Sequence, residues 1–186
     1  MPLIIESIVV TTGADGTAHL APLGMIADAD HWLLAPFRPS TTLDNLARTG
    51  RAVACFGADA RVYAGCLTGR RDWPLAALDH GQFRLADCVS HADLQVVATE
   101  DHPERPRFTC KVTQHLTHRP FAGHNRAYSA VIELAILVSR LHMLPAAKVQ
   151  AEVAYLAISM AKTAGPPEQE AWDWLMARLW AEGIAL

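Results

Sequence analysis

The spacing of apolar side chains changes once along this chain, close to Asn125, and this change constrains the fold more than any other feature. Before that position, short apolar runs alternate with polar residues and are separated by Gly, Asp and Pro. After it, apolar residues recur at every third or fourth position. Alternation is typical of strands, and the longer period is typical of helices. We therefore expect an α+β protein that is mainly β, with a β domain at residues 1–124 and a helical subdomain at residues 125–186 that packs on the β domain or on a second subunit.

Strands are expected throughout the β domain. It begins with a β-branched run, after which Gly13 and Gly16 supply the positive φ angles that a tight hairpin turn needs. The sequence predicts strands at residues 4–12, 17–23, 31–36, 51–56, 61–68, 94–99 and 108–113. Residues 69–91 show no clear pattern and receive no assignment.

Helices are marked by their capping residues. The hydroxyl of Ser40 can cap a short helix at residues 42–49, and Gly50 can end it. In the last third of the chain, helices are expected at residues 126–143, from Pro145 to Gly165 and from Pro166 to Gly183, because proline favours the first turn and glycine favours the position after the last.

Composition excludes several kinds of partner. A net charge of −3 and a pI near 6.3 indicate that the chain has no strong basic field, so no nucleic acid is expected to bind. The longest apolar stretch, residues 130–138, contains Glu133 and is shorter than the roughly 20 residues that cross a bilayer, so no membrane association is expected. The first residues carry no basic leader, and the four widely spaced cysteines are expected to be thiols, which indicates a cytoplasmic location.

The motifs of several common enzyme classes are missing: the sequence contains no GxGxxG, GxxxxGK[ST], GxSxG or HExxH. His115 and His118 stand close together, but no cysteine or carboxylate stands at ligand spacing, so they are better explained as surface histidines and no metal site is predicted. His19 is the one candidate for proton delivery, and an exposed histidine at a strand edge explains it more simply. The catalytic residues are therefore unknown.

Residues 36–43 place a cation and several hydroxyls at a helix start. Arg38, Ser40, Thr41 and Thr42 stand next to the free N–H groups of the first turn, which is the chemistry that holds a phosphate dianion. The alternative is ordinary capping, in which Ser40 or Thr41 only satisfies backbone donors. The segment taken alone favours capping.

Charged residues are also expected within an apolar helix. Arg126, Glu133 and Arg140 follow Asn125 at a spacing of seven, so they share one side of a helix that should be buried. Burying charges is costly unless they are paired or serve a ligand. Either an Arg–Glu–Arg network docks the helix, or Arg126 or Arg140 reaches an anionic ligand, and the two can coexist.

A third segment closes the second predicted strand. Pro22 lacks an N–H and Gly24 permits close approach to the backbone, so a planar ligand could lie along the main chain up to Met25. A bend that ends the strand explains these residues equally well.

Together these features resemble the DUF447 family, within the larger group of FMN-binding split β-barrels that includes flavin reductases and pyridoxamine-phosphate-oxidase-like proteins. The resemblance covers most of the chain, and it depends on the order and spacing of the elements rather than on any single one. The matching positions are Glu6, Thr11, Thr12, Gly16, residues 21–24, Pro36, Phe37, residues 41–43, Asn45, Leu46, Gly50, Asn125, Arg126, Glu133, Ser139 and Arg140.

The resemblance implies a split barrel that dimerises and binds FMN near the subunit interface. In such proteins the flavin phosphate lies after the third strand, and the isoalloxazine lies against the strand that here ends at residues 22–25. The implied cofactor-binding residues are Pro22, Gly24, Met25, Arg38, Ser40, Thr41 and Thr42, together with Asn125, Arg126 and Arg140 as shared family positions.

The implied function is that of an FMN-dependent oxidoreductase that transfers electrons between a nicotinamide-type donor and a small molecule. One alternative is a non-enzymatic protein that binds FMN or a related heterocycle. Another is a purely structural homodimer whose pocket has degenerated.

Overall fold

The computed structural model describes residues 2–184, which form two compact units. The first comprises the described residues up to Ala58 together with Trp73–Phe121. The second comprises Asp59–Asp72 and the described residues from Ala122 onward. No helix among the described residues is both long and apolar enough to cross a membrane.

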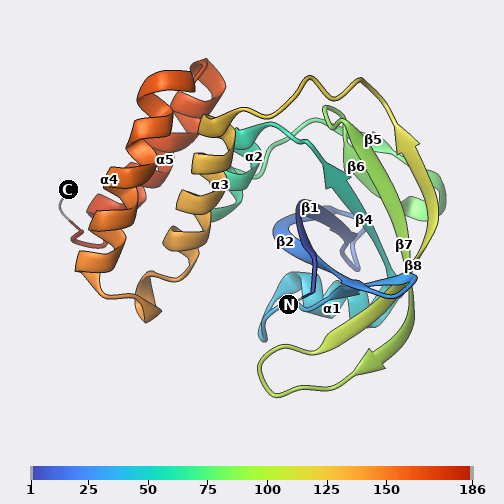
Figure 1. Cartoon of the computed structure of the whole chain (residues 1–186). Helices are drawn as coiled ribbons and strands as arrows, with labels where there is room; N and C mark the ends of the chain where they lie inside the picture. Colours follow the sequence, from blue (N-terminus) through green and yellow to red (C-terminus); the bar gives the residue numbers. More distant parts are fainter. Residues whose placement is uncertain (1, 185–186) are drawn as a thin grey trace. The chain divides into compact units, whose positions relative to one another are not determined.

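The first unit is built on six antiparallel strands that close into a barrel in the order β1-β2-β3-β8-β7-β4 (Figure 1). The strands are β1 (Ile4–Thr12), β2 (Ala18–Asp28), β3 (His31–Leu34), β4 (Arg51–Phe56), β7 (Ser90–Glu100) and β8 (Arg107–Thr117). Two of them, β1 and β4, have the predicted bounds, and four others overlap predicted strands. The predicted α+β fold with a barrel is therefore confirmed.

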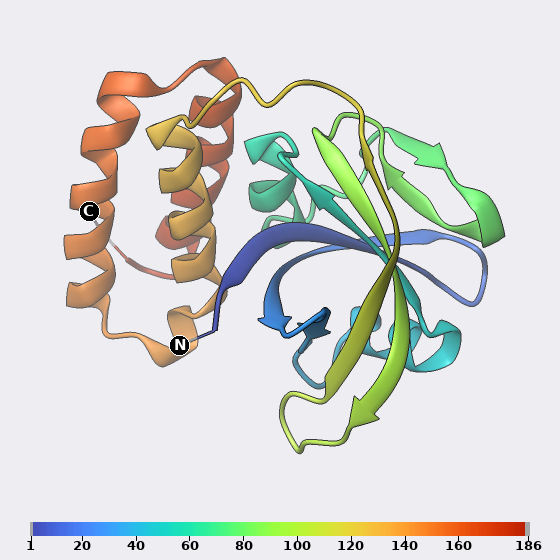
Figure 2. The same cartoon turned by 45° about the vertical axis from the view of Figure 1, so that its right-hand side comes forward.

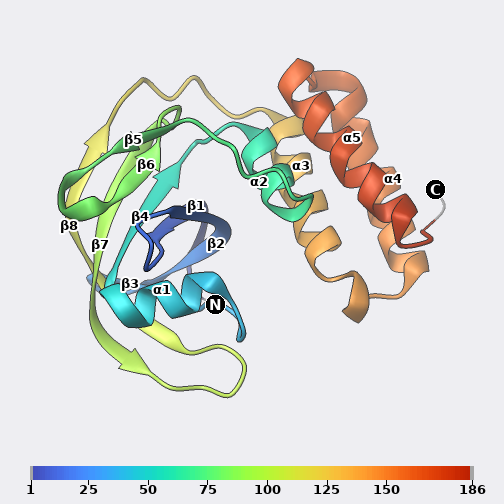
Figure 3. The ribbon, with the colours of Figure 1, turned by 180° about the vertical axis from the view of Figure 1, so that it is seen from behind.

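Alternation along each strand separates an inner from an outer face of the barrel. Val9, Ala54 and Leu94 point inward and pack with Leu43 and Leu46 of α1 (Thr41–Thr49). Figure 3 shows α1 lying across one end of the barrel. The predicted helix at 42–49 is thus confirmed, with Ser40 as its N-cap and Gly50 in the left-handed conformation after it.

The outer face of β1 and β4 is also buried, because a second small sheet covers it. Ile8, Val10, Val53 and Cys55 are at most 1% exposed. The cover consists of β5 (Leu75–Ala77) and β6 (Phe83–Leu85), joined by the 3₁₀ turn η1 (Asp79–Gly81), and β6 packs against β1 and β4. Figure 2 shows this hairpin, in green, outside the ring of six strands. It occupies much of the region that the sequence left unassigned.

The predicted strand at residues 61–68 is wrong: this segment is the helix α2 (Ala60–Leu67). Val62 and Tyr63 favour strands, but Asp59 caps the segment by accepting the Arg61 N–H at 2.8 Å. Ala60 and Ala64, one turn apart, then bury their small side chains in the core of the second unit. Tertiary packing overrides local propensity here.

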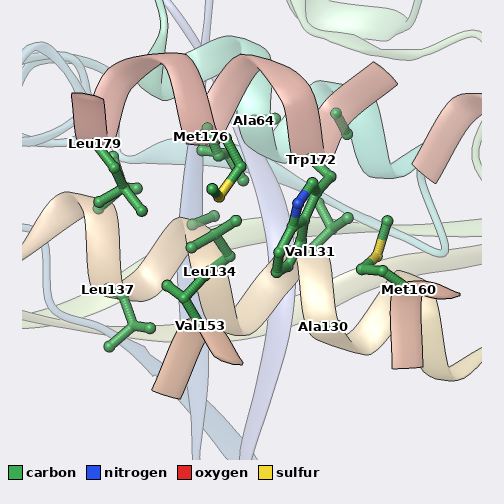
Figure 4. Packing of buried hydrophobic residues seen from close by; sticks show 14 of the residues in the cluster. Ala64, Ala130, Val131, Leu134, Leu137, Val153, Met160, Trp172, Met176 and Leu179 are labelled. Atoms are coloured by element: carbon green, nitrogen blue, oxygen red, sulfur yellow. The ribbon is translucent and has the colours of Figure 1, made fainter. Parts of the chain in front are cut away.

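Besides α2, the second unit contains three helices: α3 (Arg126–Ser139), α4 (Ala146–Thr163) and α5 (Pro166–Ala181). These three confirm the helices predicted for the last third of the chain. A 3₁₀ turn, η2 (Leu141–Met143), follows α3 and accounts for the last residues of the predicted helix at 126–143. Figure 4 shows the shared core, which includes Ala64 of α2, Val131 and Leu134 of α3, Val153 and Met160 of α4, and Trp172, Met176 and Leu179 of α5.

The predicted burial of the charged stripe on α3 is wrong. Arg126, Glu133 and Arg140 are all exposed, and no ion pair joins them within residues 2–184. The spacing of seven does keep them on one side, but that side faces away from Leu134 and Val138, which bury the opposite side of the helix. The Arg–Glu–Arg docking network therefore does not form.

Candidate functional site

The segment between β3 and α1 supplies unpaired donors at a helix start. Ser40 has an extended backbone, and its Oγ accepts the Leu43 N–H at 3.3 Å. The first intrahelical bond in this turn runs from Asp44 N–H to the Ser40 carbonyl at 3.2 Å. The amides of Thr41 and Thr42 therefore have no intrahelical acceptor, and no group in the described part of the chain bonds to either. Such amides are ready to bind an anion.

Arg38 stands just before this turn and makes a surface ion pair. Its Nη2 lies 2.9 Å from Asp101 Oδ1, and its backbone N–H donates to the Glu104 carbonyl at 2.8 Å. The Arg38–Pro39 peptide bond is cis. Because the guanidinium and carboxylate are both exposed, water screens the pair and leaves it weak. The guanidinium can exchange one anionic partner for another.

The β7–β8 loop holds this segment in place, a role that no motif in the sequence indicated. Arg105 donates from Nε and Nη2 to the Ala35 carbonyl at 3.1 and 2.9 Å, and its guanidinium lies 4.4 Å from the centroid of the Phe37 ring. A bidentate bond and a cation–π contact fix the backbone on which Arg38 stands. Register between β3 and β8 brings these residues together, which no local pattern could indicate.

A buried hydrogen bond fixes α1 against β1. Asn45 Nδ2 donates to Thr11 Oγ1 at 3.0 Å, and both side chains are buried. Arg48 adds a hydrogen bond from Nη2 to the Thr12 carbonyl. Thr11, Thr12 and Asn45 are positions of the family pattern, and the structure gives them the role of orienting α1. We call residues 38–42 the phosphate corner from here on.

The predicted site residues on β2 can contact a ligand mainly through their backbone. Met25 is buried in the barrel core, so only its main chain can meet a ligand. A Cβ placed on Gly24 would lie 2.7 Å from Ile4 Cγ2, so the small residue is required by packing against β1. Pro22 pairs with Ile8 across the β1–β2 ladder and is partly exposed.

Asn125, Arg126 and Arg140 belong to the second unit, whereas the other predicted site residues belong to the first. Asn125 caps α3: its Oδ1 accepts the N–H groups of Ala127 and Tyr128 at 2.8 and 3.3 Å, and its Nδ2 donates to the Thr163 carbonyl at 3.1 Å. The polar atoms of the Asn125 side chain are therefore already hydrogen-bonded within the protein. Arg126 and Arg140 are exposed, and neither has an ion-pair partner among residues 2–184.

His118 pairs with His91 and not with its sequence neighbour His115. One ring donates to the other between His91 Nδ1 and His118 Nε2 at 2.7 Å. The ring planes are parallel within 1°, with centroids 4.9 Å apart. The separation of the centroids equals the distance between the two bonded nitrogens plus the radius of each ring. The two parallel rings therefore lie edge to edge in one plane. His115 contacts the edge of the Phe56 ring instead.

The environment of this pair disfavours protonation. His91 is fully buried, and its Nε2 lies 3.4 Å from Asp93 Oδ1, which is too long to satisfy either buried atom. Burial lowers the pKa of His91, and the Asp93 charge only partly opposes this effect. Burial and the charge of Arg84 lower the pKa of His118. No group of three metal-binding side chains occurs in the described residues.

Comparisons with known proteins agree with this architecture. The family model described as "Protein of unknown function (DUF447) N-terminal domain" matches residues 5–119, and the model described as "Protein of unknown function (DUF447)" matches residues 125–177. No curated protein sequence matches the chain.

Solved structures share the fold at low sequence identity. An FMN-bound DUF447 protein from Methanosarcina mazei has a TM-score of 0.83 at 15% identity, covering 96% of each chain. A 2-nitrobenzoate 2-nitroreductase from Pseudomonas fluorescens has a TM-score of 0.52 at 14% identity, covering 63% of this chain and 66% of that one. An FMN-binding protein from Thermus thermophilus has a TM-score of 0.50 at 13% identity, covering 63% and 71%. The first unit therefore has the fold of FMN-binding split barrels.

Proposed function

This chain belongs to the DUF447 family, and we propose that it binds FMN and uses it to transfer electrons between a nicotinamide-type donor and a small molecule. The pair of unbonded amides at Thr41 and Thr42 carries the proposal. The chain that carries these amides aligns over 96% of its length with an FMN-bound protein of the same family. A phosphate dianion needs such donors, together with positive charge at a helix start.

The residues of the phosphate corner fit a phosphate group. The two amides would donate to its oxygens. Ser40 Oγ already accepts from Leu43, which leaves its own O–H free to donate, and the exposed hydroxyl of Thr41 is a further donor. Arg38 would exchange Asp101 for the phosphate and neutralise part of its charge.

The rest of the chain would position and shield the cofactor. Bound FMN supplies the hydride and electron chemistry. The backbone of β2 from Pro22 to Met25 would support the flavin ring, with Gly24 allowing the close packing of β2 against Ile4 of β1. Arg126 and Arg140 remain cofactor-binding candidates, since their charges are available to anionic groups, and Asn125 would act by holding the start of α3.

We further propose a homodimer located in the cytoplasm. The second half of β8 is exposed on both faces of the strand, including the apolar residues Val112 and Leu116. A strand exposed on both faces favours association with another surface. Light scattering during gel filtration tests this expectation directly.

The binding proposal is tested with the purified protein and added FMN. We expect a bound flavin spectrum, and release of FMN on denaturation. Arg38→Ala is expected to weaken FMN binding by about tenfold, since a charge-assisted bond contributes about 1.5 kcal/mol. Arg107→Ala is the matched control, because Arg107 is also exposed and paired, with Glu100 at 3.7 Å. A protein that is colourless and does not bind FMN contradicts the proposal.

A second measurement separates an enzyme from a binding protein. NADH or NADPH is added without oxygen to the FMN-loaded protein. An oxidoreductase loses its yellow colour at a rate well above that of free FMN, whereas a protein that only stores or senses FMN keeps it.

A further inference from the structure

Two cysteines that are far apart in the sequence bond to the same residue of the outer layer. Leu85 N–H donates to the Sγ of Cys55 on β4 at 3.4 Å, and the Sγ of Cys88 donates to the Leu85 carbonyl at 3.3 Å. The two thiols also hydrogen-bond to each other. Both cysteines are free and buried. No sequence motif indicated this pair, because the wide spacing of Cys55 and Cys88 excludes a CxxC motif.

Leu85 brings the two sulfur atoms together. One sulfur bonds to its N–H and the other to its carbonyl, so both lie beside the backbone of a single residue. The chain bends between Leu85 and Cys88, which lets Cys88 turn back onto the residue that Cys55 contacts. Two sulfur atoms held against one residue are within reach of each other, as disulfide formation requires.

The two thiols differ in their readiness to lose a proton. The hydrogen bond from Cys55 and the nearby charge of Arg84 lower the pKa of Cys88, while the same hydrogen bond and burial raise the pKa of Cys55. Arg84 is held in place by donating from Nη1 to the Leu85 and Ala86 carbonyls at 2.8 and 3.0 Å. The thiolate is the reactive form, so the pair has one nucleophile and one resolving thiol.

The other two cysteines provide an internal comparison. Burial raises the pKa of Cys66 to about 11 and that of Cys110 to about 12. Cys66 is nevertheless more exposed than Cys55 or Cys88. If exposure alone decided reactivity, Cys66 would react first, whereas the geometry favours Cys88.

We propose that Cys55 and Cys88 are a redox-active dithiol that hydrogen peroxide converts into an intramolecular disulfide. The Cys88 thiolate sulfur attacks a peroxide oxygen; the S–O bond forms, the O–O bond breaks, and the departing hydroxide takes up the proton that Cys88 released. The Cys55 sulfur then attacks the Cys88 sulfur; the S–S bond forms, the S–O bond breaks, and the second hydroxide leaves with the Cys55 proton. One peroxide is reduced to two waters while the two thiols are oxidised.

Access to the buried pair requires the small sheet to open. β5 and β6 form a two-stranded sheet, and β5 is largely exposed. A two-stranded sheet is marginally stable by itself and opens locally more readily than a barrel does. Oxidation is therefore expected to be slower than that of a surface thiol, and a reductant such as dithiothreitol should reverse it.

The test uses the full-length wild-type protein. It is treated with hydrogen peroxide, its remaining thiols are alkylated under denaturing conditions, and it is digested with trypsin. Cleavage after Lys and Arg, except before Pro, puts each cysteine in its own peptide: residues 52–61, 62–70, 85–107 and 108–111. We expect the 52–61 and 85–107 peptides to be joined and the other two to be alkylated, and dithiothreitol to restore all thiols.

Variants identify the order of steps. In Cys55→Ala the reaction is expected to stop at a sulfenic acid on Cys88, which dimedone labels. In Cys88→Ala, Cys55 is expected to remain a thiol. The double variant Cys66→Ala/Cys110→Ala serves as the control and should form the disulfide like the wild type. Circular dichroism checks that each variant is folded, and the wild-type peptide map decides the matter where one is not.

Three results would overturn the proposal. All four thiols of the wild type could survive peroxide, the disulfide could involve Cys66 or Cys110, or oxidation could leave Cys55 and Cys88 unlinked. None of these readouts depends on FMN, so the outcome is separate from that of the flavin proposal.

Discussion

The barrel unit has two polar clusters that differ mainly in burial. At the phosphate corner, Arg38 and Thr41 lie in solvent, and part of their hydrogen-bonding capacity is unused. On the outer face, Cys55 and His91 are opposite one another on β4 and β7, and both are fully buried. Exposed polar groups bond to water at little cost and stay available to a ligand. Buried ones must find partners within the chain, because an unpaired buried donor or acceptor costs about 1–3 kcal/mol.

Because the two clusters differ in burial, similar polar residues in them are suited to different functions. The exposed corner is suited to binding, since exchanging Asp101 or water for an anion changes little in the fold. The buried cluster is suited to specifying structure and to chemistry between its own members, such as that of the two thiols. Substitutions at the two places should therefore change different measurements.

The largest effect is expected at the centre of the buried cluster. His91→Ala removes a fully buried side chain and the 2.7 Å bond to His118, and it leaves Asp93 beside a cavity. A loss of about 2–4 kcal/mol in the free energy of unfolding is expected. Urea denaturation followed by circular dichroism measures it.

His115→Ala is the matched control, because this histidine is exposed and makes only an edge contact with Phe56. Its effect should stay within about 0.5 kcal/mol. Equal stability changes in the two variants would remove the distinction between buried and exposed clusters.

A smaller effect is expected at the buried hydrogen bond between Asn45 and Thr11, which orients α1 and with it the exposed corner. Asn45→Ala leaves Thr11 Oγ1 buried without its donor, at a cost of about 1–3 kcal/mol. Thr11→Val combined with Asn45→Ala should recover part of this loss, since no buried polar atom then stays unpaired. If FMN binds as proposed, the single variant also binds it more weakly, because α1 is no longer held firmly. Additive losses in the double variant would show that the bond does not couple the two residues.

The elements that could be predicted from the sequence are those with local signals. β1 has a β-branched run, β4 has a short apolar run between Gly50 and Gly57, and α1 has Ser40 before it and Gly50 after it. The helix α2 was missed because Val62 and Tyr63 resemble strand residues, while the surface that stabilises the helix comes from α3 and α5. Periodicity found the charged stripe of α3 but could not decide which side of the helix faces solvent.

The candidate site shows the same division. The hydroxyls and the cation of the phosphate corner all lie within residues 38–42, so a local pattern could find them. The partners Asp101 and Arg105, and the pairs His91–His118 and Cys55–Cys88, meet only through barrel closure and the register of β7 with β4 and β8. The sequence indicates surface histidines at His115 and His118, and both are exposed, but it contains no local signal for the bond of His118 to His91.

Acidification should destabilise the buried cluster and leave the corner unaffected. The pKa of His91 is lowered in the folded protein by burial, whereas in the unfolded chain it is about 6.5. The unfolded state therefore binds the proton more tightly, so this stabilisation is complete above about pH 6.5 and is lost as the pH falls toward the folded-state pKa. The loss for one proton is at most about 1.4 kcal/mol for each pH unit.

The comparison that isolates this effect is the urea midpoint at pH 7.5 and pH 5.5 in wild type and His91→Ala. Only the wild type contains the buried histidine, so it should lose more stability between the two pH values. An equal loss in both would mean that His91 does not carry the pH dependence.

The smallest effect on stability is expected at the exposed corner, where Asp101→Asn removes the partner of Arg38. The two side chains are 47% and 90% exposed, so the pair contributes about 0–1 kcal/mol and the free energy of unfolding should hardly change. If FMN binds at the corner, its affinity should instead rise by up to about fivefold, because the phosphate no longer competes with a carboxylate for the guanidinium. Added salt should shrink this gain by screening the charges. Glu100→Gln, which removes the partner of Arg107, should leave FMN affinity unchanged. Weaker binding in Asp101→Asn would mean that Asp101 positions Arg38 for the phosphate rather than competing with it, and the corner would then resemble the buried cluster in depending on a fixed partner.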